Sequence, residues 1–353
     1  MGTARTTRGG SSLVIQTSFL GDLVLTTPLL AELATRGPVD VVVTPGGAPL
    51  LAHHPAVRDV IIFDKRGAHA GLPGLWRFGR GLRTRADGSA RTIDAAYLAQ
   101  GSLRSAALAR ITGARAVVGF DSSGGRALYT ERVHYDRTQH HAERLWRLAV
   151  GNSEPVPDAE RIRPRLYPGE DERAVVDDLL RQAPCGDRPF LALAPGSIWG
   201  TKRWPAFPGL AAALRDRYRL VVIGGKDDAP LAAEIVRAAG AEHVLDTTGR
   251  LTLLASAELI RRCAALVTND SAPQHLASAV GTPTLTIFGP TVPAFGFGPL
   301  APRHASAGVA SLDCRPCHGH GPKVCPRGHF RCMRDLPISD IEATLARLLA
   351  ASA

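Results

Sequence analysis

The stretch ALVTNDSAPQHLASAV, residues 265–280, combines the features that decide the fold. It begins with a short apolar run that predicts a buried strand and continues through the polar loop Asn269–Ser271. A helix-like segment then opens at Pro273, a residue that suits the first turn of a helix because its missing N–H needs no partner there. A buried strand followed directly by a helix is typical of the units from which parallel sheets are built.

The same alternation extends outward over most of the chain. Short apolar runs predict strands at 13–16, 39–44, 60–63, 94–98 and 116–119, and again at 190–194, 220–224, 243–245, 265–268 and 284–288. The predicted helices include 23–36, 103–111, 207–217, 230–239, 253–263 and 273–280. Because continuous apolar strands that alternate with helices indicate a parallel sheet covered on both faces, we predict an α/β fold.

A length of 353 residues suits two domains better than one core. The polar, Pro-rich stretch Gly151–Gly169 separates the two series of strands and predicts the linker. We expect one domain over residues 1–165, a second over 166–337, and a C-terminal helix over 338–353 that packs back on the first domain. Two doubly wound domains that face each other would place a ligand cleft at the carboxyl ends of their strands.

Charge and hydropathy limit the classes of function. The formal net charge of +10 favours an anionic partner, although a basic, Arg-rich proteome explains it equally well. Basic residues are scattered rather than blocked, which argues against a nucleic-acid-binding arm. Apolar stretches are interrupted before the roughly 20 residues that a membrane span needs, and the N-terminus has no apolar segment or cleavage site of a signal peptide. We therefore expect a cytoplasmic protein.

The first candidate loop is Gly21–Pro28, which follows the first predicted strand. Asp22 lies at the start of the next helix, where a carboxylate can act as general base and take a proton from an acceptor hydroxyl. The same position suits an ordinary helix-capping aspartate, and this loop alone slightly favours that alternative. The dinucleotide fingerprint G-x-G-x-x-G is absent from the loop.

The second candidate loop, Ala194–Ser197 followed by Lys202–Pro205, lies between the first strand and first helix of the second half. Its glycine lets the backbone approach a ligand closely, and Lys202 supplies a point positive charge for a diphosphate. Ser197 can donate a hydrogen bond to the same phosphates. A solvated Lys-Arg pair is the alternative interpretation, and the loop alone favours it.

The third candidate loop is the polar segment of the opening stretch. Free N–H groups at the helix start form an anion site, and Asp270 is suited to bind a ribose or sugar hydroxyl. His275 falls in the first helical turn, near the expected phosphates. The alternative is that Asp270 or Ser271 is an N-cap and His275 a satisfied partner of the loop, which explains the cap but not the whole string.

Four of the six cysteines follow the pattern Cys314-x2-Cys317-x7-Cys325-x6-Cys332. In a cytosolic protein this spacing is typical of metal ligands rather than of disulfides, so a structural Zn or Fe site is one hypothesis. Substitute ligands are available in His318, His320 and His329. The equally weighted alternative is four reduced thiols that pack a Gly/Pro-rich loop.

Together the three loops resemble the signatures of glycosyltransferase family 9, the bacterial lipopolysaccharide heptosyltransferases, in the family's order and spacing. The residues that carry the resemblance are Gly21-Asp22 with Leu25-Thr26-Thr27-Pro28, Lys202-Arg203-Trp204-Pro205, and Thr268-Asn269-Asp270-Ser271 with His275. The resemblance covers nearly the whole chain. The four-cysteine string is most similar to the heptosyltransferase II branch.

The resemblance implies a GT-B fold, in which two Rossmann-like, doubly wound domains with parallel sheets face each other across a cleft. The acceptor would bind the first domain and ADP-heptose mainly the second. The family's catalytic base falls on Asp22, and candidate acceptor or loop contacts fall on Gly21, Thr26 and Thr27. Its donor-binding residues fall on Ser197, Lys202, Asp270, Ser271, Ala272 and His275.

Two residues depart from the family's pattern. Ala272 replaces the glycine that most members carry, and Gln274 stands where Met or Ser is common. Since a methyl group at Ala272 narrows the approach of the backbone to the sugar or diphosphate, the donor's identity is less certain than the fold.

The resemblance also implies the reaction and its partners. Family members invert the anomeric centre in one displacement and are not thought to need a metal or other cofactor for catalysis. We expect ADP-heptose as donor, a lipid-linked core oligosaccharide as acceptor, and a peripheral position at the inner face of the inner membrane.

Three alternatives remain beside this interpretation. One is a family-9 enzyme with another nucleotide sugar or glycan acceptor, and another is a non-catalytic sugar-nucleotide-binding protein. A nucleic-acid-binding protein with a four-cysteine finger is disfavoured, because it leaves the three loops unexplained.

Overall fold

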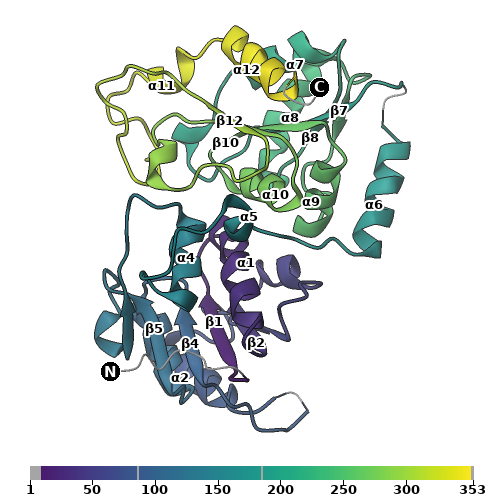
Figure 1. Ribbon diagram of the computed structural model, residues 1–353. Coiled ribbons are helices and arrows are strands. Elements are labelled where there is room, and N and C mark those ends of the chain that lie inside the picture. Colours follow the sequence, from purple (N-terminus) through teal and green to yellow (C-terminus); the bar gives the residue numbers. More distant parts are fainter. Residues whose placement is uncertain (1–8, 86, 184–185, 351–353) are drawn as a thin grey trace. The chain divides into compact units, whose positions relative to one another are not determined.

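The computed structural model describes residues 9–85, 87–183 and 186–350 (Figure 1). The chain forms two compact units, Met1–Pro164 and Arg165–Ala353, and the division falls within the Pro-rich stretch. In the described part of the chain, none of the helices combines the length and the apolar character that crossing a membrane requires.

The first unit is built on one six-stranded parallel sheet in the order β3-β2-β1-β4-β5-β6. Its strands are β1 (Ser12–Gln16), β2 (Val39–Val43), β3 (Asp59–Ile62), β4 (Ala95–Leu98), β5 (Ala116–Phe120) and β6 (Glu131–Val133). Its helices are α1 (Leu20–Ala34), α2 (Gly71–Gly81), α3 (Leu103–Ile111), α4 (His141–Val150) and α5 (Ala159–Ile162), with short 3-10 turns at Ala48–Leu51 and Arg126–Leu128. Helix α1 packs beside α4, and α2 packs beside α3.

The second unit repeats this plan with a sheet in the order β12-β11-β10-β7-β8-β9. Its strands are β7 (Phe190–Ala194), β8 (Arg219–Val222), β9 (Val244–Asp246), β10 (Ala265–Asn269), β11 (Thr284–Ile287) and β12 (His304–Ala307). Its helices are α6 (Glu170–Arg181), α7 (Phe207–Leu214), α8 (Ala229–Ala239), α9 (Leu253–Arg261), α10 (Ala272–Val280), α11 (Arg331–Arg334) and α12 (Ile338–Ala350). Short 3-10 turns lie at Gly200–Lys202, Lys226–Asp228 and Pro293–Phe295. Counted from its own first strand, the second sheet has the same strand order as the first, which is that of a Rossmann fold.

Burial explains why the central strands are recognisable in the sequence. Every residue of β1, β2, β5, β7 and β10 is buried, as expected where helices cover both faces of a parallel sheet. The ten predicted strands are therefore all present. Two of the four edge strands, β6 and β12, were not predicted, because they are short, partly exposed and polar.

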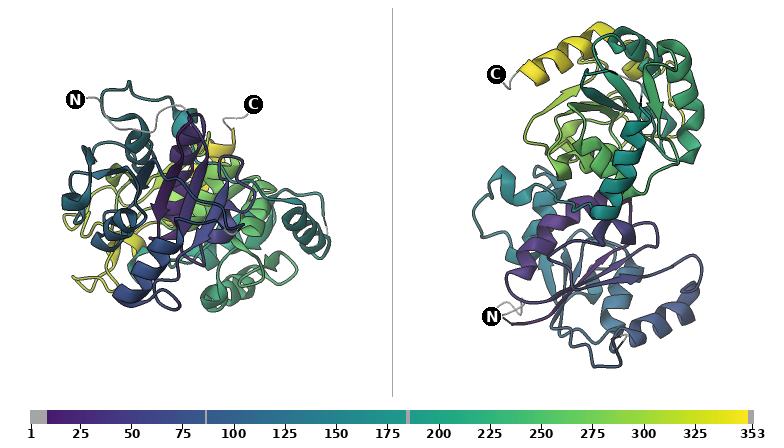
Figure 2. Two further views of the ribbon diagram at one scale, coloured as in Figure 1. Left: turned by 90° about the horizontal axis from the view of Figure 1, so that it is seen from below. Right: turned by 90° about the vertical axis from the view of Figure 1, so that its right-hand side faces the viewer.

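The C-terminal helix requires a correction. Figure 1 and Figure 2 show α12, in yellow, beside elements of the second unit, and it contacts α7, β11 and β12 there. Ile341, Leu345 and Leu348 form its apolar stripe and are buried in the core of that unit. The expectation that this helix packs on the first domain is wrong, because its apolar face is already used by the second unit.

Candidate active site

The central feature of the second unit is a buried ion pair between Lys202 and Asp270. The Lys202 ammonium donates to Asp270 Oδ2 at 2.6 Å, and both residues are less than 10% exposed. Asp270 follows β10, while Lys202 ends a 3-10 turn in the loop after the neighbouring strand β7. Because carboxyl ends of parallel strands share one edge of the sheet, residues 68 positions apart meet.

Two further side chains complete the coordination of Asp270. Thr291 Oγ1 donates to Oδ2 at 2.7 Å, and Gln274 Nε2 donates to Oδ1 at 2.9 Å. Both oxygens of the buried carboxylate are thus hydrogen-bonded, as a buried charge requires. The hydrogen bond from the ammonium to this carboxylate orients the Lys202 side chain, so that its positive charge lies at the carboxyl end of the sheet.

Asn269 and Gly196 hold the two loops together. Asn269 Nδ2 donates to the Pro195 carbonyl at 2.7 Å, and its Oδ1 accepts from the backbone N–H of Trp204 at 3.1 Å. Ser271 Oγ donates to the Gly196 carbonyl at 3.3 Å and so joins the same two loops. The lysine loop and the aspartate loop therefore form one rigid structure.

The other predicted donor residues surround this pair. Ser271 is the N-cap of α10, although its hydroxyl donates back to the Gly196 carbonyl instead of capping the helix. Ala272 is the first residue of α10, and His275 is buried within it. Ser197 is buried, and its hydroxyl accepts from the N–H of Trp199. The start of α10, where backbone N–H groups lack helical partners, adjoins the Lys202–Asp270 pair.

Sequence reasoning missed two members of this network. Gln274 was noted only as a departure from the family's pattern, yet it binds Asp270 directly. Thr291 was not considered, because it lies outside the three loops. Its position after β11, the strand beside β10, was the available signal, since polar residues at adjacent strand ends converge.

The cysteine-containing loop packs against Lys202. Thr201 Oγ1 donates to the Pro322 carbonyl, and Gly321 lies against the lysine's aliphatic stem, where an added Cβ would meet Lys202 Cε at 3.2 Å. The Arg315 guanidinium binds the carbonyls of Phe288, Thr291 and Val309. This loop therefore supports both partners of the ion pair, Lys202 directly and Asp270 through Thr291.

The structure does not support a metal site at the four cysteines. In residues 9–85, 87–183 and 186–350, no group of three or more His, Cys, Asp or Glu side chains is arranged to hold a metal ion. Cys314 Sγ lies 3.8 Å from His329 Nε2, whereas Cys317 Sγ lies against the Pro290 carbonyl. Burial and the neighbouring thiols raise the pKa of Cys332 to about 11. Of the four thiols, Cys332 is buried and Cys317 is exposed, and the arrangement does not support a metal ion among them.

In the first unit, Asp22 lies in the first turn of α1, directly after β1. The N-cap of this helix is Phe19, so Asp22 is not the capping residue of the alternative interpretation. Ser18 Oγ donates to Asp22 Oδ2 at 2.5 Å, and the carboxylate is half-buried. A carboxylate so placed is stabilised by the positive end of the helix and can still accept a proton from a ligand.

The threonines after Asp22 have a structural role. Thr26 and Thr27 are buried, and Thr26 Oγ1 donates to the Asp22 carbonyl at 2.7 Å. Pro28 has no N–H for the Val24 carbonyl four residues earlier, and Thr27 Oγ1 donates to that carbonyl at 2.9 Å instead. These two side chains therefore stabilise the loop and helix rather than form a surface that an acceptor could touch. Gly21, also in the first turn, is half-buried.

Cations gather near the loop that carries Asp22. Lys65 Nζ donates to the Thr17 carbonyl at 2.6 Å, and Arg104 Nη1 donates to the Lys65 carbonyl at 3.4 Å. Burial, together with the charges of Arg66 and Arg104, lowers the pKa of Lys65. Sequence reasoning did not single out these cations, because they come from different loops.

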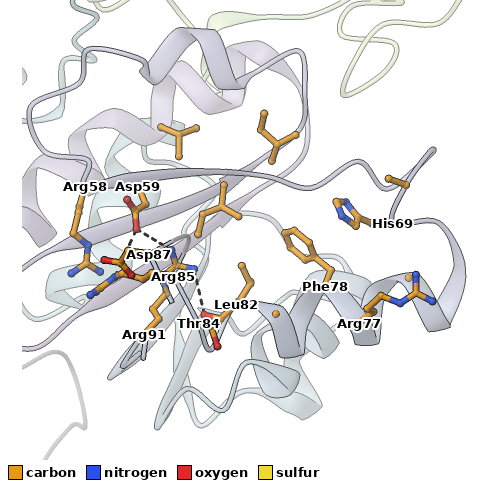
Figure 3. Close-up of a pocket in the computed structure, with 16 residues that line it drawn as sticks. Arg58, Asp59, His69, Arg77, Phe78, Leu82, Thr84, Arg85, Asp87 and Arg91 are labelled. Carbon is orange, nitrogen blue, oxygen red and sulfur yellow. Dashed lines mark hydrogen bonds and ion pairs between the residues drawn. The ribbon is translucent and has the colours of Figure 1, made fainter. Parts of the chain in front are cut away.

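A separate cavity of about 910 Å³ lies between the edge strand β3 and helix α2 (Figure 3). Figure 3 shows Arg58, Asp59 and Arg91 at one end and His69 and Arg77 at the other. Asp59 pairs with Arg91 at 2.9 Å, so charges at that end are compensated.

Comparison with known proteins identifies the family. The model of glycosyltransferase family 9 (heptosyltransferase) matches residues 76–325, which is most of the chain. The chain belongs to glycosyltransferase family 9. It is 32% identical over 319 residues to lipopolysaccharide heptosyltransferase 1 of Pseudomonas aeruginosa, covering 86% of this chain and 85% of that protein. It is 28% identical over 302 residues to lipooligosaccharide heptosyltransferase 2 of Haemophilus influenzae, covering 80% and 84%.

Solved structures of family 9 proteins share the fold. A glycosyltransferase family 9 protein from Veillonella parvula aligns with a TM-score of 0.83 at 23% identity, covering 97% of this chain and 98% of its own. The ADP-heptose heptosyltransferase II of Escherichia coli aligns at 0.77 and 24% identity, covering 97% and 99%. The predicted GT-B class, with two Rossmann-like α/β domains and parallel sheets, is confirmed. The chain is thus a glycosyltransferase of family 9.

Proposed function

We propose that this glycosyltransferase transfers heptose from ADP-heptose to an inner-core acceptor of lipopolysaccharide and inverts the anomeric centre. The observation that carries the proposal is the buried Lys202–Asp270 pair beside the start of α10. Lys202 supplies a cation, and the start of α10 supplies free backbone N–H groups. Both lie at the carboxyl end of the sheet, where a Rossmann-like unit binds phosphates. Family 9 relatives that align over at least 80% of the chain are heptosyltransferases, which supports heptose as the sugar.

The second unit is proposed to bind the donor and stabilise the leaving group. As the bond from the anomeric carbon to the diphosphate oxygen breaks, its electron pair stays on ADP, which gains negative charge. The Lys202 ammonium and the α10 N–H groups oppose this charge, so ADP leaves without protonation by an acid. Ser197, Ser271, Ala272 and His275 are proposed as further donor contacts, and Asp270 as the residue that orients Lys202 and binds a donor hydroxyl.

The first unit is proposed to bind the acceptor and activate its hydroxyl. Asp22 takes the hydroxyl proton while the oxygen attacks the anomeric carbon from the side opposite to ADP. One bond forms as the other breaks, and the configuration inverts. This mechanism assigns each step to side chains of the protein and calls on no cofactor. The cations Lys65, Arg66 and Arg104 suit phosphate groups of a lipid-linked acceptor.

A different donor is the second candidate, because Ala272 and Gln274 depart from the family's pattern. The relatives also include heptosyltransferases of both type 1 and type 2, so the similarity to the type II branch remains a proposal. A non-catalytic protein is less well supported, since it would have no need of a carboxylate at position 22. We propose that the enzyme works in the cytoplasm, at the inner face of the inner membrane where a lipid-linked acceptor is available.

Calorimetric titration tests the donor. We expect wild-type protein to bind ADP-heptose and not GDP-mannose or UDP-glucose. Lys202→Ala should lose this binding, whereas Lys202→Arg, which retains the charge, should keep part of it. Because removing one partner of a buried ion pair also costs stability, circular dichroism must show that each variant is folded. Selective binding of another nucleotide sugar would refute heptose and leave the proposed chemistry intact.

Transfer kinetics test the general base. Asp22→Asn should bind ADP-heptose as wild type does and lose at least 100-fold in kcat, because the amide cannot take the proton. A variant with wild-type kcat would refute the role of Asp22 while the donor assignment stands.

A further inference from the structure

We propose that helix α2 is a docking surface for an anionic lipid bilayer, with Leu72 and Trp76 entering the headgroup region. The inference deepens the proposed function, on which it rests for the idea that the acceptor is lipid-linked. It concerns residues outside the proposed donor and acceptor sites. We call the exposed side of α2, formed by Leu72, Trp76, Arg77 and Arg80, the α2 surface.

Charge is the first observation that supports a lipid partner. Residues 72–85, which comprise most of α2 and the segment after it, contain four basic side chains and no acidic one, namely Arg77, Arg80, Arg83 and Arg85. Clusters of four to eight Lys and Arg residues on an amphipathic helix are typical of surfaces that bind anionic lipids.

Neighbouring carboxylates do not pair with the two arginines of α2. Asp64 accepts hydrogen bonds from the backbone N–H groups of its own turn, and Asp59 pairs with Arg85 and Arg91. Within the described ranges of the chain, neither Arg77 nor Arg80 forms an ion pair. The α2 surface therefore presents net positive charge to solvent.

Exposed apolar side chains are the second observation. Leu72 is 82% exposed and Trp76 is 55% exposed, which is unusual for large apolar residues on one helix. Together with Arg80 they recur at every fourth position, so they form one stripe along α2. The Arg80 guanidinium lies 4.8 Å from the centre of the Trp76 ring. A tryptophan beside an arginine is suited to the interface between water and lipid, where an apolar ring and a charge are both stabilised.

The opposite side of α2 fixes this stripe in place. Phe78 packs against Phe63 with ring centroids 4.7 Å apart. It also packs against His69 at 4.5 Å, and Figure 3 shows Phe78 and His69 beside the cavity. Gly74 and Gly79 lie where a Cβ would meet the His69 backbone at 2.6 Å and Ile111 Cγ2 at 2.7 Å. Because the helix is anchored so closely, the exposure of Leu72 and Trp76 cannot be relieved by turning them inward. Nucleic acid would use the positive charge but gains nothing from Leu72, so lipid fits the surface better.

Vesicle flotation tests the proposal with the full-length protein. Wild type should float with vesicles of phosphatidylcholine containing 30% phosphatidylglycerol and bind vesicles of phosphatidylcholine alone at least tenfold more weakly. Arg77→Glu/Arg80→Glu and Leu72→Ser/Trp76→Ser should each weaken binding to the anionic vesicles about tenfold or more. The matched charge control is Arg173→Glu/Arg181→Glu on α6, an exposed pair among acidic residues, and Val175→Ser is the apolar control. Both controls should bind as wild type does.

Tryptophan fluorescence reports insertion directly. Trp146 and Trp204 are buried and Trp199 lies in the second unit, so a blue shift on anionic vesicles that disappears in Trp76→Phe locates the contact at α2. Calorimetry of the α2 variants should give wild-type binding of ADP-heptose. Wild-type flotation of both α2 variants, equal binding to neutral vesicles, or no change in Trp76 emission would overturn the docking proposal. Loss of donor binding by wild type would instead refute the proposed function, whatever the vesicles show.

Discussion

At the scale of single residues, Thr291 tests how the Asp270 carboxylate is held. We expect Thr291→Val to raise the Kd for ADP-heptose about tenfold, because a hydrogen bond to a charged group contributes about 1.5–3 kcal/mol and its loss frees Asp270 and Lys202 to move. Isothermal titration measures the change.

Thr286 provides the matched control for Thr291. Its hydroxyl is buried in β11 and has no hydrogen-bond partner among the residues that the structure describes. Thr286→Val should therefore leave donor binding unchanged and should not lower the free energy of unfolding. Equal Kd values for both variants and wild type would mean that Asp270 does not depend on Thr291.

Thr27 and Pro28 form a second residue-level test. Thr27→Val should lower the free energy of unfolding by about 1–3 kcal/mol, because the buried Val24 carbonyl loses its donor. The loss should be smaller in a Pro28→Ala background, where the backbone N–H of residue 28 can donate to Val24. Urea denaturation of the two single variants and the double variant measures the coupling between them. Strict additivity would show that Thr27 does not substitute for the missing N–H.

Residue-level prediction from the sequence depended on local context. Lys202 and Asp270 were identified because each lies in a loop directly after a predicted strand, and the structure brings them together. Thr291 could have been found from its position after a strand beside β10, whereas the cation cluster around Lys65 could not, since its members come from different loops. The four cysteines have ligand-like spacing, yet among the described residues no group of side chains is arranged to hold a metal ion.

At the scale of elements, α2 is one of several helices, with α4, α5 and α11, that were not predicted. Four of its eleven residues are glycine, and glycine is among the weakest helix formers. The long apolar helix α1 and the buried strands were predicted, because burial on one or both sides requires runs of apolar residues that are visible in the sequence. Gly79 allows α2 to pack closely against α3. A contact between two helices of this kind gives no periodic pattern of residues in the sequence of α2 itself.

Glycine replacements in α2 separate packing from helix propensity. Gly79→Ala should lower the free energy of unfolding by up to about 2 kcal/mol, because the clash with Ile111 costs about 1–3 kcal/mol and outweighs a propensity gain of about 1 kcal/mol. Gly81→Ala has nothing within 4 Å of the added Cβ and should raise stability by up to about 1 kcal/mol. Chemical denaturation of both variants decides the matter, and stabilisation by Gly79→Ala would contradict the packing.

At the scale of the whole molecule, the two units predict two unfolding transitions in scanning calorimetry. Each unit has its own sheet and core, so their stabilities can be altered separately. ADP should raise the transition temperature of the second unit alone, because a ligand that binds only the folded state stabilises it by mass action. A single transition that responds as a whole would contradict this expectation.

Low pH should destabilise the first unit, because two of its histidines are buried. Burial lowers the pKa of His54 to about 4 and that of His141 to about 3, from 6.5. Below pH 6.5 the unfolded chain takes up protons that the folded unit does not, so stability falls as the pH falls. At pH 5, each histidine should lower the free energy of unfolding of the first unit by roughly 2 kcal/mol. The transition temperature of that unit should therefore fall by on the order of 10 °C relative to pH 7. The lowered carboxyl pKa values of Glu32 and Glu258 matter only below about pH 4.5.

A substitution pair checks the origin of this acid sensitivity. His54→Gln should reduce the shift between pH 7 and pH 5, while His53→Gln, which replaces the exposed neighbour, should retain it. An unchanged shift in His54→Gln would exclude His54 as its source.

The identical strand order of the two sheets also bears on how the chain is made. Apolar strands such as β1 and β7 are interchangeable in character, so an unfolded chain holding all twelve described strands risks pairing a strand with the wrong sheet. The chain order prevents this, because β6 ends at Val133 and β7 begins only at Phe190. At a translation rate of about 5–20 residues per second, the ribosome needs roughly 3–11 s to cross that interval. The first sheet can close in this time, before any competing strand has been synthesised.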